Sequence, residues 1–236
     1  MNSLIDLAAQ AVNSTQLECS LYGIVPGHLE PLLRERLIAL CGGLPATHPF
    51  LEHEIGFVPA NETPDGVARN DDIILRLNSQ LDPAVALEAQ PALHERKWVM
   101  IQYGKPESAN GATIRPAVYA NVDGGDVFKF MRLLGYTFGF EHVRRGYCWG
   151  GMYKIVVSQV YKLTERSRLE SARTISAEAQ PRDVPWLVEV VSQQVPHESA
   201  ASVANLLGEV RSFLAGVVEL EPVDHLYLRE RVRYMS

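Results

Sequence analysis

The chain has 236 residues, of which 47% are hydrophobic and 21% are charged, and its formal net charge is −6. The hydrophobic content excludes wholesale disorder, and the acidic balance excludes a dedicated binder of nucleic acid or anionic membranes, which would carry a basic stripe. No stretch of 18 apolar residues predicts a membrane span, and no signal peptide is visible. Three widely spaced cysteines indicate reduced thiols in a cytosolic or nuclear protein.

The first half of the chain predicts one helix among several strands. Leu29, Leu33 and Leu37 recur at helical spacing and predict a helix over 28–41, ended by two glycines. A shorter apolar spacing predicts one or two helical turns over 1–13. Alternating or apolar runs predict strands over 17–25, 50–58, 72–78 and 98–103. The polar, proline-containing segments 59–71 and 79–95 are predicted to be flexible insertions.

The second half repeats this order. A strand is predicted over 114–122, and Asp126 begins a short helix that Gly135 closes. A long hairpin follows, with strands over 136–147 and 152–163 joined at Gly150-Gly151. The polar segment 164–185 is predicted to be a third flexible insertion. A last strand over 186–193 and an amphipathic helix that includes Leu207 complete the pattern.

These elements predict an α+β fold in a single domain, residues 1–236. About eight strands and three helices occur in the same order in each half, strand–helix–strand–strand–strand, with a closing helix after the second. Such an order predicts an antiparallel sheet curled into a β-barrel with three flanking helices, which leaves few open strand edges.

Motifs for catalysis are sparse. The sequence has no nucleophile elbow, no Walker loop and no dinucleotide-binding glycine motif after a strand. The densest polar cluster lies around Glu52 and Glu54, which share one face of a predicted strand while His53 points the other way. We predict a solvated strand face for this carboxylate pair and a solvated edge for residues 141–145. We predict no metal and no cofactor.

One enzyme class deserves comparison with this carboxylate pair. Triphosphate-tunnel hydrolases carry a Glu-x-Glu-x-Lys strand inside an eight-stranded barrel, where carboxylates bind metal and basic groups hold phosphates. Here Gly56 stands at the lysine position. The basic residues on the other predicted strands, such as Arg76 and Arg115, are isolated among apolar neighbours. The catalytic residues of a tunnel hydrolase are therefore predicted to be missing.

Aromatic residues are frequent on or beside the predicted strands. Most of them are expected in the core, where aromatic side chains dominate the packing energy. Tyr103, Tyr147 and Trp149 lie near predicted turns, and we predict that these three are exposed and bind a protein partner.

Four segments, in order, resemble the family of Mediator subunit 18. They are LYGIVPGHLEPLLRERLIALC (21–41), FLEHEIGFV (50–58), WVMIQYGKPE (98–107) and the stretch 126–163, which contains RLLGYTFGFEHVRRGYCWGG. The C-terminal helix and VELEPVD (218–224) resemble the end of that family. Together the matching segments cover about two-thirds of the chain, and their combination carries the resemblance, since no single segment is diagnostic.

The resemblance implies a non-enzymatic barrel akin to the triphosphate tunnels, in the head module of a nuclear transcription co-regulator. It implies a heterodimer with Mediator subunit 20, tethered by the C-terminal helix of Mediator subunit 8, and contact with RNA polymerase II through the head module. It implies no direct contact with nucleic acid and none with a membrane. Two alternatives stay open, a metal-dependent triphosphate hydrolase of the tunnel class and a ligand-binding barrel. A hydrolase lumen should contain many paired charges, and a scaffold lumen should be apolar.

Overall fold

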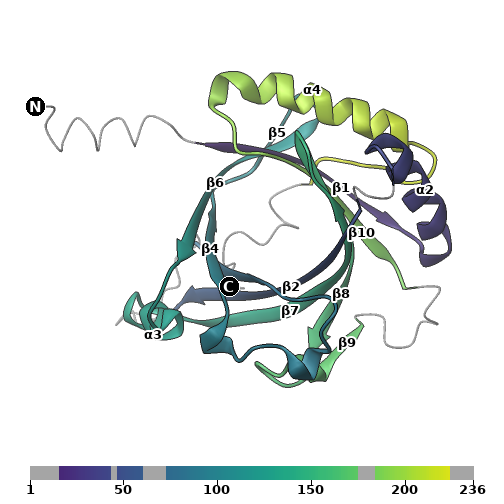
Figure 1. Ribbon diagram of the computed structural model, residues 1–236. Coiled ribbons are helices and arrows are strands. Elements are labelled where there is room, and N and C mark those ends of the chain that lie inside the picture. Colours follow the sequence, from purple (N-terminus) through teal and green to yellow (C-terminus); the bar gives the residue numbers. More distant parts are fainter. Residues whose placement is uncertain (1–15, 44–46, 61–72, 175–183, 224–236) are drawn as a thin grey trace, which may run out of the picture.

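The computed structural model describes residues 16–43, 47–60, 73–174 and 184–223. Figure 1 views the protein along the axis of a closed antiparallel barrel, with helices packed on its outside. Eight strands form the ring in the order β1–β10–β8–β7–β2–β3–β4–β6, and β6 closes it by pairing with β1. The predicted eight-stranded barrel with three helices is confirmed.

The strands of the ring have the following bounds: β1 Leu17–Val25, β2 His48–Pro59, β3 Leu75–Gln80, β4 Trp98–Tyr103, β6 Ala112–Val122, β7 Tyr136–Trp149, β8 Tyr153–Leu163 and β10 Trp186–Ser192. Two three-residue strands add to it, β5 Glu107–Ala109 beside β6 and β9 Ala172–Thr174 beside β8. The predicted strands therefore lie close to the observed ones.

Closure of the ring depends on a long-range pairing. Glu18 of β1 lies opposite Arg115 of β6, and the two strands pair over Leu17–Ser20. The longest pairing joins β2 to β7 from His48 to Pro59, with a bulge between Gly56 and Phe57. Because successive side chains point to opposite faces of a strand, each strand presents one set of side chains to the lumen and another to the outside.

Two helices cover one side of the barrel (Figure 1). They are α2 (Glu30–Leu40), preceded by the short 3₁₀ helix η1 (Gly27–Leu29), and α4 (His197–Leu214). The largest apolar cluster joins these helices to the outward side chains of β1, β8 and β10, and includes Leu21, Leu37, Val188 and Leu207, all fully buried. This burial of apolar surface holds the helices on the barrel.

The third helix, α3 (Val127–Leu133), lies outside the barrel beside β7. The Asp126 side chain caps it by accepting a hydrogen bond from the Lys129 amide at 2.9 Å, and Gly135 follows it with φ +79°. Val127 and Met131 pack into a second apolar cluster with Leu77 of β3. Its outer face leaves Leu133 77% exposed.

The predicted insertions contain some regular structure where they are described. β3 extends to Gln80, and 81–97 includes the 3₁₀ helices η3 (Leu87–Ala89) and η4 (Leu93–Glu95). The segment after β8 includes η5 (Leu169–Ser171) and β9. The predicted turns over 1–13 and most of 59–71 lie outside the described residues. The flexibility of the three insertions and the single-domain boundary stay predictions.

Glu141 of β7, whose side chain lies outside the lumen, connects the segments 81–97 and 164–171 to the barrel. Arg96 donates to Nδ1 of His53 at 2.8 Å, so the other ring nitrogen, Nε2, carries the proton that it shares with Glu141 at 2.7 Å. The second oxygen of Glu141 accepts the amide of Ser167 at 2.9 Å. Glu141 therefore ties 81–97 and 164–171 to β2 and β7, and the prediction of a solvated edge at 141–145 is wrong for this residue.

Candidate functional site in the barrel lumen

The lumen is lined by charged side chains whose inward orientation was not predicted from the sequence. Glu52 and Glu54 of β2 point inward and are only 4% and 7% exposed, because the ring of strands closes around them. The prediction that this pair faces solvent is therefore wrong. A closed barrel buries both faces of its strands, so a polar side chain at alternate positions marks the lumen here and not the surface.

Arginines from three strands neutralise the lumen carboxylates. Arg76 of β3 binds Glu54, and Arg144 of β7 binds Glu52 through two nitrogens, Nε at 3.0 Å and Nη2 at 2.5 Å. Gln80 donates a further bond to Glu52 at 2.7 Å. The prediction that Arg76 is isolated among apolar neighbours is wrong. The outcome is a set of charge-assisted hydrogen bonds across neighbouring strands.

The network continues on the opposite wall. Arg144 also binds Glu189 of β10, so one guanidinium serves two carboxylates. Arg115 of β6 donates to Oε1 of Glu18 from Nη2 at 2.8 Å and from Nε at 3.1 Å. The Tyr119 hydroxyl donates to the other oxygen of Glu18. The lumen is thus crossed by ion pairs, contrary to the apolar lumen that we expected of a scaffold.

The ion pairs shift the acidity of the lumen groups. Burial raises the pKa of the Glu54 carboxyl, but the positive charge of Arg76, aided by His142 and Arg144, outweighs burial and lowers that pKa to about 2. Burial lowers the pKa of His142, which favours its neutral form. For the Arg144 guanidinium, burial favours the neutral form, but Glu189 and Glu52 outweigh it and hold the pKa well above its ordinary value. Glu54 is therefore ionised at neutral pH and bound to arginine.

Gly56, at the position of the lysine in tunnel-class hydrolases, has no room for a larger side chain. Gly56 continues the face of Glu52 and Glu54, and a Cβ at this position would lie 2.2 Å from Cε1 of Phe140. A larger side chain could enter the lumen there only if the Phe140 ring moved. The Phe140 ring therefore occupies the space that a side chain at position 56 would need.

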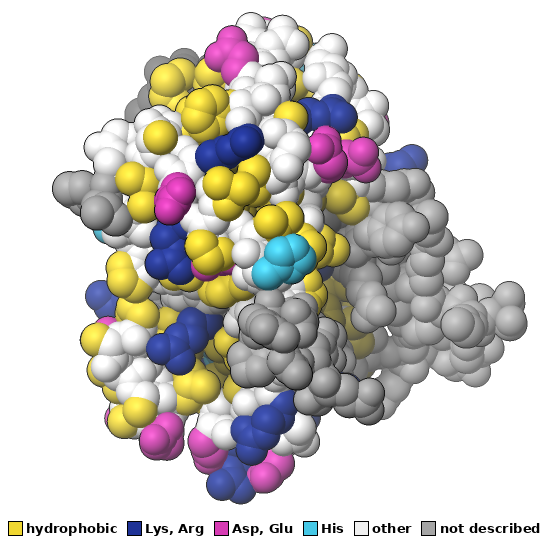
Figure 2. Space-filling view, turned by 90° about the vertical axis from the view of Figure 1, so that its right-hand side faces the viewer, with side chains coloured by type: hydrophobic (Ala, Val, Ile, Leu, Met, Phe, Trp, Pro, Cys, Tyr) yellow, Lys and Arg dark blue, Asp and Glu magenta, His cyan; other side chains and the backbone are white. Residues whose placement is uncertain are grey.

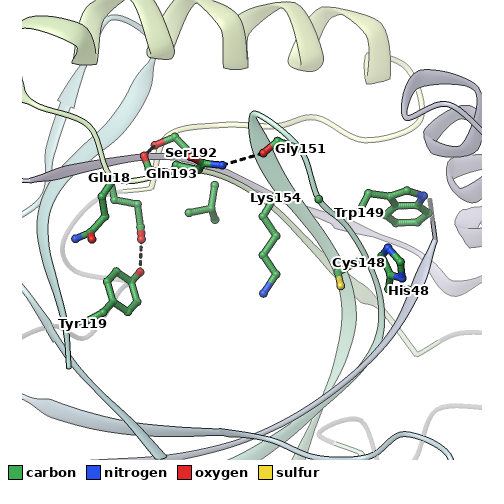
Figure 3. A pocket seen from close by; sticks show the side chains of 12 residues that line it. Glu18, His48, Tyr119, Cys148, Trp149, Gly151, Lys154, Ser192 and Gln193 are labelled. Atoms are coloured by element: carbon green, nitrogen blue, oxygen red, sulfur yellow. Dashed lines mark hydrogen bonds between the residues drawn. The ribbon is translucent and has the colours of Figure 1, made fainter. Parts of the chain in front are cut away.

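Two of the cavities in the lumen have volumes of about 820 and 860 Å³. Lys154 of β8 lines the first and Val160 the second. These residues are six positions apart on one strand, about 20 Å, so the cavities lie toward opposite ends of the barrel. Figure 3 shows the first, with Lys154 pointing into it and Tyr119 bonded to Glu18 on the far wall. Lys154 lies over the Phe50 ring, 5.2 Å from its centre.

The three aromatic residues that the sequence nominated for partner binding lie in separate places. Tyr103 is inside the barrel, where the Arg115 guanidinium lies 3.5 Å from its ring centre. Tyr147 is outside, stacked on Trp186 and bonded to Arg34 of α2 through its hydroxyl at 2.6 Å. Trp149 is 1% exposed in the apolar cluster under the helices. The expected exposure is wrong for Trp149, and a partner-binding role for the three stays a prediction.

Within the described ranges, no group of three or more histidine, cysteine, aspartate or glutamate side chains is arranged to hold a metal ion. The same residues include no helix with the length and apolarity needed to cross a membrane. On the face seen in Figure 2, basic, acidic and hydrophobic side chains are interspersed, without a stripe of one charge.

Comparison with known proteins gives one family and several similar folds. A family model described as Med18 protein matches residues 17–231. A search of curated proteins finds no match. A chain in the structure of the Schizosaccharomyces pombe Mediator head module is similar at a TM-score of 0.70 and 22% identity, covering 88% of this chain and 98% of that chain. This likeness confirms the barrel fold.

More distant similarities are found among other barrels. The PH1819 protein of Pyrococcus horikoshii OT3 has a TM-score of 0.49 and 11% identity, covering 89% of this chain and 97% of its own. The RNA triphosphatase domain of a mimivirus mRNA capping enzyme has a TM-score of 0.45 and 10% identity, covering 90% and 94%. The family model, in contrast, spans most of the sequence. The chain therefore belongs to the Med18 family, the family of Mediator subunit 18.

Proposed function

We propose that this chain is a non-enzymatic structural subunit of the Mediator head module, which links transcriptional regulators to RNA polymerase II in the nucleus. Membership of the Med18 family and the likeness to a chain of the S. pombe head module support this assignment. The single observation that carries the non-enzymatic part is the pairing of Glu52 and Glu54 with arginines in the lumen.

This pairing is unfavourable for metal-dependent chemistry. A carboxylate that binds Mg²⁺ must turn its oxygens to the cation, and Glu52 already accepts bonds on both oxygens, from Arg144 and Gln80. Displacing Arg144 from Glu52 would break one of the two buried ion pairs of this guanidinium, and breaking a buried ion pair is costly. The lumen charges are thus suited to hold strands together.

The finer part of the proposal concerns the partners. We assign to the chain a heterodimer with Mediator subunit 20 and the capture of the C-terminal helix of Mediator subunit 8. Partner binding needs exposed apolar surface, which is rare on monomers in contiguous form. Phe130, Leu133 and Leu134, in and just after α3, supply such a surface, with 48%, 77% and 47% exposure.

Co-purification tests this proposal. The full chain is expressed with subunits 20 and 8 from the same source, and the mass of the product is measured by light scattering after size exclusion. A stable 1:1:1 complex is expected. A chain that elutes alone, while subunits 20 and 8 are folded and present, would contradict the partner assignment.

A paired set of variants sharpens the test. Leu133→Asp alters the exposed patch on α3, and Met152→Asp alters an equally exposed residue, 75%, in the β7–β8 turn. If the α3 patch takes part in assembly, only Leu133→Asp weakens the complex. Equal behaviour of both variants would move the contact away from α3.

A tunnel hydrolase remains the second candidate, since a charged lumen is what we expected of an enzyme. Its test is hydrolysis of inorganic triphosphate with Mg²⁺ or Mn²⁺. Turnover by the wild-type chain that is lost in a folded Glu54→Gln variant would establish the hydrolase, and we expect none. The ligand-binding barrel is supported by the two cavities alone.

A further inference from the structure

The 820 Å³ cavity opens to solvent at the end of the barrel where the turn between β7 and β8 lies (Figure 3). Exposed side chains line this opening, among them Lys154 and His48, while Glu18 on the far wall is only 2% exposed. The volume of this cavity lies within the range of about 300–1,000 Å³ that small-molecule sites occupy. The cavity is therefore large enough and accessible enough to take up a small molecule.

Most polar side chains that line this cavity already have hydrogen-bond partners. Both oxygens of Glu18 accept bonds, one from the Arg115 guanidinium and the other from the Tyr119 hydroxyl. Gln193 and Gln194 each donate their side-chain amide to a backbone carbonyl. These groups are therefore bound to the protein itself and hold the cavity wall in place.

Lys154 is the exception. Its ammonium group lies 5.2 Å from the centre of the Phe50 ring and forms no ion pair with any carboxylate in the described part of the chain. Among the described residues that line the cavity, Glu18 is the only carboxylate, and it is already paired with Arg115. The cavity thus contains an ammonium group whose charge no described carboxylate balances.

The charge and the lining of the cavity favour a ligand with one negative charge. One ammonium group balances a single carboxylate, whereas a phosphate group, with up to about two negative charges, would exceed it. The rest of the lining includes apolar surface, from Val191 of β10 and from the ring of Tyr119, which is 41% exposed. Small-molecule sites combine apolar surface with a few polar groups in this way. These features fit an organic carboxylate with an apolar body.

From these observations we propose that the 820 Å³ cavity binds a small monocarboxylate with an apolar body. Its carboxylate accepts a charge-assisted hydrogen bond from the Lys154 ammonium group, close to the ring of His48, which lines the same cavity. Its apolar body lies against Val191 and the Tyr119 ring. This binding goes beyond the assembly role proposed above, because it uses the lumen and not the surface of α3.

Calorimetric titration of the full chain with octanoate tests the chemical class of the ligand. We expect one saturable site for octanoate. We expect none for octylamine, which has a similar tail and the opposite charge, and none for pyrophosphate, which has no apolar body.

Variants of Lys154 test the role of its charge. Lys154→Met keeps an unbranched side chain without the charge and is expected to weaken octanoate binding about tenfold or more. Lys154→Arg keeps the charge and is expected to retain the binding. Lys129→Met removes a lysine that is exposed on α3 and is the matched control, with unchanged binding.

Alkylation of the native cysteines tests the location. Cys148 lines the cavity, whereas Cys41 follows α2 on the outside. We expect saturating octanoate to slow the alkylation of Cys148 by iodoacetamide several-fold and to leave the rate for Cys41 unchanged. In Lys154→Met, the same concentration of octanoate should protect Cys148 much less.

Four results would contradict the proposal. The wild-type chain could show no saturable octanoate site, or Lys154→Met could bind octanoate as tightly as the wild-type chain, which would place the carboxylate elsewhere. A pyrophosphate site that depends on Lys154 would show that the cavity takes phosphate groups instead. Octanoate binding that leaves Cys148 unprotected would show that the site lies outside this cavity.

Discussion

The two faces of the barrel wall are both buried but are built differently. On β1, Cys19 and Leu21 point outward into the apolar cluster under α2 and α4, while Glu18 and Ser20 point inward, and all four are at most 2% exposed. The outer face is held by apolar contacts and the inner face by ion pairs. Burial alone therefore does not determine whether a strand position requires an apolar or a charged residue. The side chains that pack against that position determine it.

The two faces should also respond differently to substitution. The outer face gains stability from apolar area removed from water, about 25 cal/mol per Å². The buried ion pairs of the inner face contribute little net stability, because the cost of removing charges from water offsets their attraction. Removing one partner is nevertheless costly, because it leaves the other charge buried alone. The following substitutions test this contrast, in order of decreasing effect.

The largest effect is expected for Leu207→Asp, which places a charge in the apolar cluster. Leu207 is fully buried between α4 and the barrel, and the new carboxylate would find no partner there. We expect a loss of about 4 kcal/mol or more in the free energy of unfolding, measured by urea denaturation. Phe213→Asp, on the exposed side of the same helix, is the control. If both variants lose equally little, α4 does not pack as described.

A smaller but substantial effect is expected for Glu54→Gln. This change leaves Arg76 in the lumen with a neutral neighbour, and a loss of about 3 kcal/mol follows for a broken buried pair. The double variant Glu54→Leu with Arg76→Met removes both charges and should lose less than the single one. A double variant that is less stable than Glu54→Gln would show that the pair itself is strongly stabilising.

The lowered pKa of Glu54 predicts that the free energy of unfolding depends on pH. The pKa of Glu54 is about 2 in the folded chain, below the value of 4.5 for a free side chain, so unfolding favours its protonation. Its contribution, at most about 3 kcal/mol, is complete above the unfolded pKa and is lost as the pH falls toward the folded pKa. Urea denaturation at about pH 6 and about pH 3 should therefore show a smaller acid loss in Glu54→Gln than in the wild-type chain. Equal acid losses in the two would contradict the pairing.

The smallest effect is expected outside both faces. Leu133→Asp changes a side chain that is 77% exposed on α3, so the free energy of unfolding should change by no more than about 0.5 kcal/mol. Thermal denaturation checks this, and a large loss would mean that the α3 surface is covered within the chain. An unchanged stability makes this variant suitable for the assembly experiment.

Most of the fold could be predicted from the sequence because its signals are local. The periodicity of 28–41, the cap at Asp126, the glycine at 135 and the hairpin around Gly150 each depend on residues close together in the chain. The apolar stripe of α4 likewise identified Leu207 as buried. Their order in two similar halves was enough to predict a barrel with closing helices.

The lumen could not be predicted in the same way. Glu52 and Arg144 are far apart in the sequence, and only the β2–β7 register places them opposite each other. A charged residue at alternate strand positions ordinarily indicates solvent, and only ring closure through β1 and β6 turns it inward. Trp149 was misplaced for a related reason, since its position beside a turn did not reveal the helices that cover it.

Titration of the full chain with Mn²⁺ tests the central claim most directly, namely that arginines already occupy the lumen carboxylates. Calorimetry of the wild-type chain and of Arg76→Met, which frees Glu54, compares a paired carboxylate with an unpaired one. We predict that the wild-type chain shows no saturable Mn²⁺ site at millimolar Mn²⁺. If a Mn²⁺ site is found at all, it should be found in Arg76→Met and not in the wild-type chain. A one-to-one site in the wild-type chain that disappears in Glu54→Gln would contradict the account and favour a metal-dependent hydrolase.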